Sequence, residues 1–139
     1  LQRDELATDG RLSAALAQAA REVVLELVHE APPSLATLVG SPVHAPRVHE
    51  GLVVSGDRFV STSAESRALQ ARLPAALAVE MEGAAMAQVC ASYGVPCAMV
   101  RTISDRADDQ AHLDFPRFLA EVASPMSREI VCRALAMLG

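Results

Sequence analysis

Two carboxylates, Glu80 and Glu82, stand inside an otherwise apolar run of the chain. Acidic side chains are seldom buried without a partner, so each of them needs one. If residues 76–82 are extended, Glu80 and Glu82 share one face of a strand and Met81 points to the other. In a structural interpretation, Glu82 favours the start of the following helix and Glu80 pairs with Arg101. In a functional one, Glu82 points into the crevice at the carboxyl end of its strand and accepts hydrogen bonds from sugar hydroxyls.

A second candidate site is the pentapeptide 101–105, in which a buried apolar strand ends in the hydroxyl of Ser104 and the carboxylate of Asp105. Ser104 and Asp105 thus also lie at the carboxyl end of a predicted strand. Aspartate after serine is common in turns and caps, which is the structural interpretation. The sharper hypothesis makes Asp105 a general acid.

The third candidate is Phe59, which follows the strand-breaking pair Gly56-Asp57 and so reaches the mouth of the predicted sheet. The chain has three Phe, one Tyr and no Trp, so stacking surface is scarce. A phenylalanine at that place can stack on a flat base, and it can equally plug the core.

Other classes of site are disfavoured by the sequence. The four histidines have no metal-ligand spacing, and the acidic loop lacks the glycine-centred pattern of a calcium loop, so we expect neither metal nor cofactor. A net charge of −5 makes nucleic acid or an anionic membrane a poor partner. All 12 basic residues are arginine, which excludes Schiff-base and P-loop lysine chemistry.

Three cysteines without a CxxC predict buried thiols in a reducing compartment, by default the cytoplasm.

The elements that must position these residues alternate along the chain. With 139 residues, 51% of them hydrophobic, one compact domain is expected. The order of helices and strands predicts an α/β sandwich with a largely parallel sheet. We expect helices at 11–30, 64–72, 83–93 (buried, because it is apolar on most sides) and 115–138 (kinked at Pro125), and strands at 49–56, 76–81 and 97–104 (central).

Four blocks in this order, SGDRFV, AVEMEGAAMAQVC, GVP and VRTISDRAD, resemble the second half of the 5′-methylthioadenosine/S-adenosylhomocysteine nucleosidases of the nucleoside phosphorylase superfamily. The resemblance is close over residues 51–118 and loose in the flanking helices. It implies a nucleoside phosphorylase-like fold, a three-layer α/β sandwich with a mixed, largely parallel central sheet. Residues 1–139 would then be the C-terminal part of a single domain.

The resemblance also implies how a purine nucleoside is held. Phe59 would stack on adenine, and the backbone of Val60 would bond the edge of the base. Met81 and Glu82 would line and bind the ribose, with Glu82 taking its hydroxyl protons and Glu80 lying beside them.

The same resemblance implies the catalytic step. Asp105, supported by Ser104, would protonate or hydrogen-bond adenine at N7, and Phe115 would border the pocket. Cleavage of an N-glycosidic bond leaves negative charge on the departing base, so a proton makes the base a better leaving group. A well-placed general acid contributes roughly 10²–10⁴-fold when burial raises its pKa toward the working pH.

In that family the first half of the domain supplies the carboxylate that activates water, and nothing in this sequence corresponds to it. We therefore expect the chain to be inactive alone and to need an upstream half, and we expect a homodimer without metal or cofactor. The alternatives left open are a purine nucleoside phosphorylase, a futalosine-type nucleosidase and a non-catalytic oligomerisation module.

Overall fold

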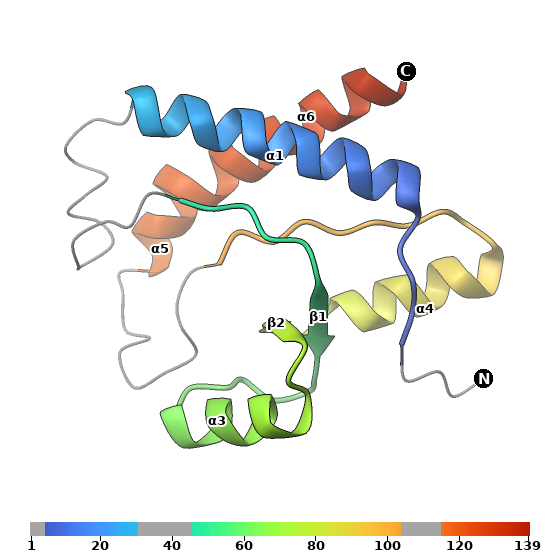
Figure 1. Ribbon diagram of the computed structural model, residues 1–139, viewed down its shortest axis with the longest axis vertical. Coiled ribbons are helices and arrows are strands. Elements are labelled where there is room, and N and C mark those ends of the chain that lie inside the picture. The colour runs from blue at the N-terminus through green and yellow to red at the C-terminus, as the bar shows by residue number, and fades with distance from the viewer. Residues whose placement is uncertain (1–4, 31–45, 104–114) are drawn as a thin grey trace.

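The computed structural model describes residues 5–30, 46–103 and 115–139 of the chain (Figure 1). In these ranges the elements follow one another as α1 (Gly10–Glu30), β1 (Leu52–Ser55), α3 (Ser63–Arg72), β2 (Ala76–Glu80), α4 (Gly83–Tyr93), α5 (Phe115–Phe118), the π-helical turn η1 (Leu119–Ala123) and α6 (Ser124–Leu138). None of the described helices has the length and apolar character needed to cross a bilayer.

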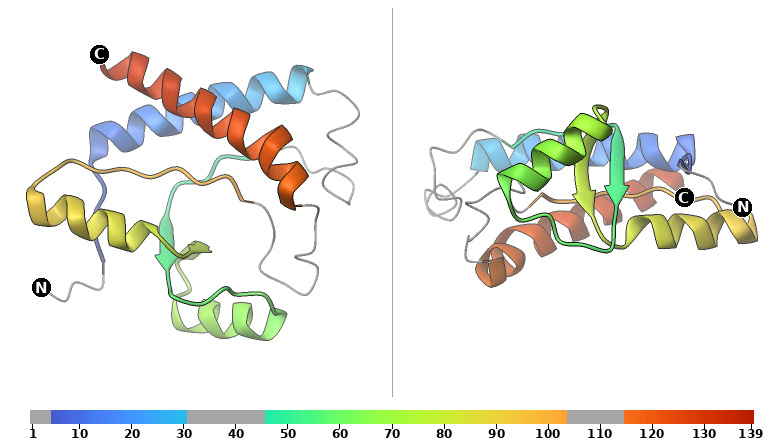
Figure 2. Two further views of the ribbon diagram at one scale, coloured as in Figure 1. Left: turned by 180° about the vertical axis from the view of Figure 1, so that it is seen from behind. Right: turned by 90° about the horizontal axis from the view of Figure 1, so that it is seen from below.

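The core lies between the first and last long helices, α1 and α6, which cross each other (Figure 2). Its buried members are mostly small, which lets the helices approach closely: Ala15, Ala19, Ala20, Val23, Ile130 and Ala134. At the rim of this contact, the Arg133 guanidinium of α6 binds both carboxylate oxygens of Glu26 on α1, at 2.6 and 2.7 Å. At the start of α1, Asp9 accepts the Leu12 N–H at 2.9 Å and so caps the helix.

Strands β1 and β2 pair in parallel, and α3 connects them. Thr62 caps α3, because its hydroxyl accepts the Glu65 N–H at 3.3 Å. In register, Val54 lies beside Val79 and Ser55 beside Glu80, and the Gly56 N–H extends the ladder to the Glu80 carbonyl at 3.0 Å. Since the strands are parallel, both end at the same edge of the sheet.

The segment before residue 104 differs from our prediction. A central strand was expected at 97–104, but residues 97–103 are not in a strand, and Ser104 lies outside the described residues. A strand requires backbone hydrogen bonds to a neighbouring strand. Here the Cys97 carbonyl accepts the Asp9 N–H at 2.7 Å, and Asp9 is not part of a strand.

Helix α4 has the predicted bounds, but the prediction that it is buried is wrong. Gly83 is buried, whereas most of its other side chains, Met86, Val89 and Tyr93 among them, are exposed. Its composition favours burial, yet burial requires a neighbouring element, and the described residues leave most of this helix open. The expectation of three buried thiols is also wrong, since Cys132 is exposed while Cys90 and Cys97 are half-buried.

Near Pro125, where a kink is predicted, the structure shows a change of helix type. The wide turn η1 runs directly into α6, and the Ser124 N–H bonds to the Leu119 carbonyl, five residues back. Proline has no N–H to donate, and its ring crowds the carbonyl four residues earlier. A π-type turn just before Pro125 accommodates the ring without ending the helical path.

Candidate functional site

The candidate site lies where β1 and β2 end and α4 begins. Ser55 is the last residue of β1 and Glu80 the last residue of β2, and the two are register partners. Two residues later, Glu82 occupies the N-cap position of α4. The parallel pairing thus gathers the strand ends and the start of a helix at one edge of the sheet, where α/β proteins commonly bind ligands.

Glu80 is the centre of the hydrogen bonding at this edge. Its carboxylate accepts the Gly83 N–H on both oxygens, at 2.8 and 2.9 Å, and the Glu82 N–H at 3.0 Å. The Ser55 hydroxyl and the Arg101 guanidinium also donate to it. The side chain is 11% exposed, and this mostly covered anion has donors from the backbone, from Ser55 and from Arg101.

These contacts keep Glu80 ionised. Burial by itself raises the pKa of the carboxyl, but the bonds from Ser55, from the Glu82 and Gly83 N–H groups and the charge of Arg101 together hold the pKa below its ordinary value. An anion at the N-terminus of α4 is also favoured by the helix dipole. The structural interpretation is therefore confirmed for Glu80: it pairs with Arg101 and anchors the start of a helix.

Glu82 has a different environment. It stands at the N-cap of α4, as the structural interpretation expects, but its side chain is 69% exposed and, among the described residues, makes no capping bond to the helix. The Arg101 Nη2 lies 3.4 Å from the Glu82 Oε2. Met81, between the two acids, is exposed as well. Of the two carboxylates, Glu82 is the one available to a ligand.

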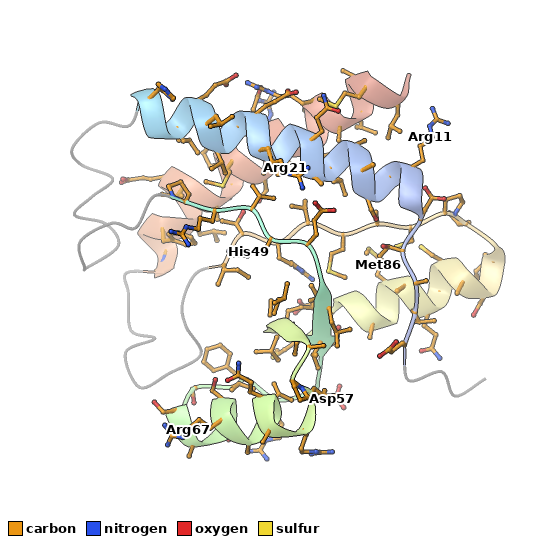
Figure 3. All side chains as sticks on the ribbon, viewed as in Figure 1. Arg11, Arg21, His49, Asp57, Arg67 and Met86 are labelled. Atoms are coloured by element: carbon orange, nitrogen blue, oxygen red, sulfur yellow. The ribbon has the colours of Figure 1, made fainter. Side chains whose placement is uncertain are left out.

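Phe59 follows β1 by four residues and is 64% exposed, so it does not plug the core of the described structure. Its neighbour Val60 is half-buried. Asp57, in the turn that leads from β1 toward α3, lies at the same end of the strand (Figure 3). The strand end therefore delivers an aromatic side chain to open space, as the interpretation of Phe59 as a stacking residue requires.

Three further predicted residues are outside what the structure describes. Ser104 and Asp105 lie beyond the described residues, and for Phe115, at the start of α5, only the backbone is described. The segment leading to Asp105 is tied to α6, because the hydroxyls of Thr102 and Ser127 are 3.0 Å apart.

Ser55 is a site residue that the sequence reasoning missed. Its hydroxyl donates to Glu80 and accepts the Ala84 N–H at 2.8 Å, and so it bridges β1 and the first turn of α4. No local signal marks it, because its two partners lie 25 and 29 residues away in the sequence.

The described residues give no group of His, Cys, Asp or Glu that could hold a metal ion. A cavity of about 300 Å³ lies on the other side of α4, between residues 6–9 and residues 94–97, and is lined mainly by small apolar side chains. Neither Glu80, Glu82 nor Phe59 lines it.

The chain is similar to known proteins over almost its whole length. A family model described as the phosphorylase superfamily matches residues 3–136. S-adenosylhomocysteine nucleosidase from Streptococcus pyogenes, solved with 5-methylthiotubericidin, is 30% identical with a TM-score of 0.70, over 99% of this chain and 49% of that one. The 5′-methylthioadenosine/S-adenosylhomocysteine nucleosidase from Neisseria meningitidis, solved with methylthio-immucillin-A, is 33% identical with a TM-score of 0.68, over 96% and 51%.

A third similar structure is futalosine hydrolase of Helicobacter pylori strain 26695, at 31% identity and a TM-score of 0.68, over 99% of this chain and 50% of that one. The chain thus spans about half the length of each of these proteins. The α/β architecture with a parallel sheet agrees with theirs, as part of a larger domain.

Proposed function

The chain belongs to the phosphorylase superfamily, and from this premise we propose that it carries the base- and ribose-binding half of a nucleosidase. The proposed reaction is hydrolysis of the N-glycosidic bond of 5′-methylthioadenosine and S-adenosylhomocysteine, which releases adenine. The supporting observation is the difference between the two acids at the sheet edge: the Glu80 side chain is 11% exposed and holds several donors, while that of Glu82 is 69% exposed, and Phe59, four residues after β1, is exposed too.

In the proposed mechanism, Glu82 accepts hydrogen bonds from the ribose hydroxyls, and its charge stabilises the positive charge that develops on the sugar. Met81 lines the ribose site. Phe59 stacks on the adenine ring and the backbone of Val60 bonds its edge. These assignments suit the exposure of Glu82, Met81 and Phe59 at one end of the parallel strands.

Protonation of the leaving base is assigned to Asp105, supported by Ser104, with Phe115 bordering the pocket. The N-glycosidic bond breaks, its electron pair stays on adenine, and the proton from Asp105 neutralises the base at N7. Water adds to the sugar carbon, activated by a carboxylate that the rest of the fold supplies. Glu80 is not assigned as a proton donor, because its carboxylate accepts bonds from Ser55, from backbone N–H groups and from Arg101, which hold its pKa below the ordinary value.

The activity is assigned to the complete fold. The chain corresponds to about half of each similar structure, and the apolar side chains of α4 are open in the described residues. We propose that the remaining half covers this helix and contributes the water-activating group.

Futalosine hydrolysis is the second candidate, since futalosine hydrolase is as similar in structure as the neisserial nucleosidase. Phosphorolysis is less well supported. A helix N-terminus is a common phosphate site, but that of α4 already holds the Glu80 carboxylate, and Arg101 is paired with the same group.

The test is product analysis with the complete protein. It is supplied with 5′-methylthioadenosine, S-adenosylhomocysteine or futalosine, with and without phosphate, and the released base and sugar are separated by chromatography. Adenine and a free reducing sugar formed without phosphate support the proposal. Release that requires phosphate and yields a sugar phosphate, or turnover of futalosine alone, would refute it.

A further inference from the structure

The first turn of α4 is capped by side chains at the ends of β1 and β2 and not by its own N-cap residue. The first N–H groups of a helix have no partner within it, and a local side chain at the N-cap normally accepts one of them. Here the N-cap residue Glu82 makes no such bond among the described residues. The Gly83 N–H goes to the Glu80 carboxylate and the Ala84 N–H goes to the Ser55 hydroxyl, both at strand ends.

Ser55 has contacts in two directions. Its hydroxyl hydrogen is donated to the Glu80 carboxylate, and its oxygen accepts the Ala84 N–H at 2.8 Å. One hydroxyl therefore joins the end of β1, the end of β2 and the start of α4. Residues 81 and 82, which the proposed function gives to the ribose, form the short link between these fixed points.

We infer that Ser55 is a positioning residue for nucleoside binding: by holding both Glu80 and the first turn of α4, its hydroxyl fixes the Met81-Glu82 link that faces the ribose. The role assigned to this link rests on the proposed function. Ser55 itself touches no substrate in this account and acts through Glu80 and Ala84.

Loss of the Ser55 hydroxyl removes the hydrogen bonds that it makes to Glu80 and to the start of α4. In a Ser55→Ala variant, the Ala84 N–H has no acceptor on β1, and the Glu80 carboxylate keeps its backbone donors and Arg101 but loses one bond. The Ala84 N–H is exposed and would bond to water instead, so the first turn of α4 loses its tie to β1. The link is then less well defined, while the α1–α6 core, which Ser55 does not touch, is unaffected.

The experiment compares Ser55→Ala, Ser55→Thr and Ser92→Ala in the complete protein. Threonine keeps the hydroxyl. Ser92 is the matched control, because its hydroxyl bonds to the Gln88 carbonyl at 2.8 Å near the other end of α4 and its loss is chemically the same. Amide exchange at Ala84 is followed by NMR, with amides of α1 and α6 as the measure of an intact fold.

In Ser55→Ala we expect Ala84 exchange to accelerate about tenfold, as for the loss of one hydrogen bond, with α1 and α6 unchanged. The kcat/KM for the nucleoside should fall about 10- to 100-fold. Inhibition by free adenine should stay the same, because the base is held elsewhere. A general structural weakening would instead reduce adenine binding too. Ser55→Thr should keep the Ala84 exchange rate and kcat/KM of the unmodified protein, and Ser92→Ala should change neither of these two quantities.

Unchanged Ala84 exchange in Ser55→Ala would overturn the inference, and so would faster exchange with full kcat/KM. Failure of the proposed function looks different: the unmodified protein would turn over no nucleoside. In that case the exchange comparison still decides whether the Ser55 hydroxyl fixes the link.

Discussion

Arg101 contacts two carboxylates with the same nitrogen: its Nη2 donates to Glu80 and lies 3.4 Å from Glu82. The contacts are unequal, because the Glu80 side chain is nearly buried while that of Glu82 is mostly exposed. Arg101 therefore forms its closer ion pair with Glu80, and its contact with the exposed Glu82 is the weaker one. Two acids two residues apart thus have separate tasks, one in anchoring the fold and one facing a ligand.

Replacement of Glu80 by glutamine should lower the free energy of unfolding by about 1.5–3 kcal/mol at neutral pH, since it weakens hydrogen bonds to a charged, nearly buried group. The effect depends on pH. The pKa of Glu80 is lower in the folded protein than its ordinary value of 4.5, so its stabilisation is complete above that value and is lost as the pH falls through the folded pKa. Denaturant unfolding over this acidic range should show the two stability curves converging. Curves that stay parallel would contradict the account.

Glu82→Gln should leave stability unchanged within about 0.5 kcal/mol, because the side chain is exposed. Its kcat/KM for the nucleoside should fall about 10- to 100-fold, through loss of a charged hydrogen-bond acceptor for the ribose. Steady-state kinetics and calorimetric binding of adenine provide the measurement. If adenine affinity fell as much as kcat/KM, Glu82 would have a structural role instead.

Asp105→Asn removes the proposed proton donor while keeping its size. We expect kcat to fall about 10²–10⁴-fold with an unchanged melting temperature. Asp57→Asn is the control, since Asp57 is exposed and is not among the hydrogen-bond partners described for Glu80. Full activity of Asp105→Asn would remove the general-acid assignment.

Ile130 tests whether the α1–α6 contact is the main core. It is 3% exposed, and Ile130→Ala should cost about 2–5 kcal/mol of unfolding free energy. Leu135, 62% exposed on the same helix, is the matched site, and Leu135→Ala should cost less than about 0.5 kcal/mol. Equal losses in chemical denaturation would show that this helix buries a different face.

The sequence predicts well those features that depend on neighbouring residues. The expected ranges of α3 and α4 agree with the structure to within one residue, and α4 ends before Gly94, whose φ of 66° suits glycine. The pairing of Glu80 with Arg101 was also predictable, because a carboxylate in an apolar run needs a cation.

Features that depend on distant partners were predicted less well. Residues 97–103 have the apolar composition of a central strand, but a strand needs a partner, and composition does not supply one. The prediction that α4 is buried was wrong for the same reason, since burial also needs a partner element. Ser55 was missed because its importance comes from two contacts 25 and 29 residues away, which no local pattern reveals.

Tyr93, at the end of α4, is 81% exposed and is the single tyrosine of a chain that has no tryptophan. When the exciting light is at a wavelength that phenylalanine does not absorb, emission from this polypeptide therefore originates at one known point on its surface. Any protein segment that settles over this end of the helix would alter that emission, so the natural sequence already contains an optical reporter for assembly and needs no added dye.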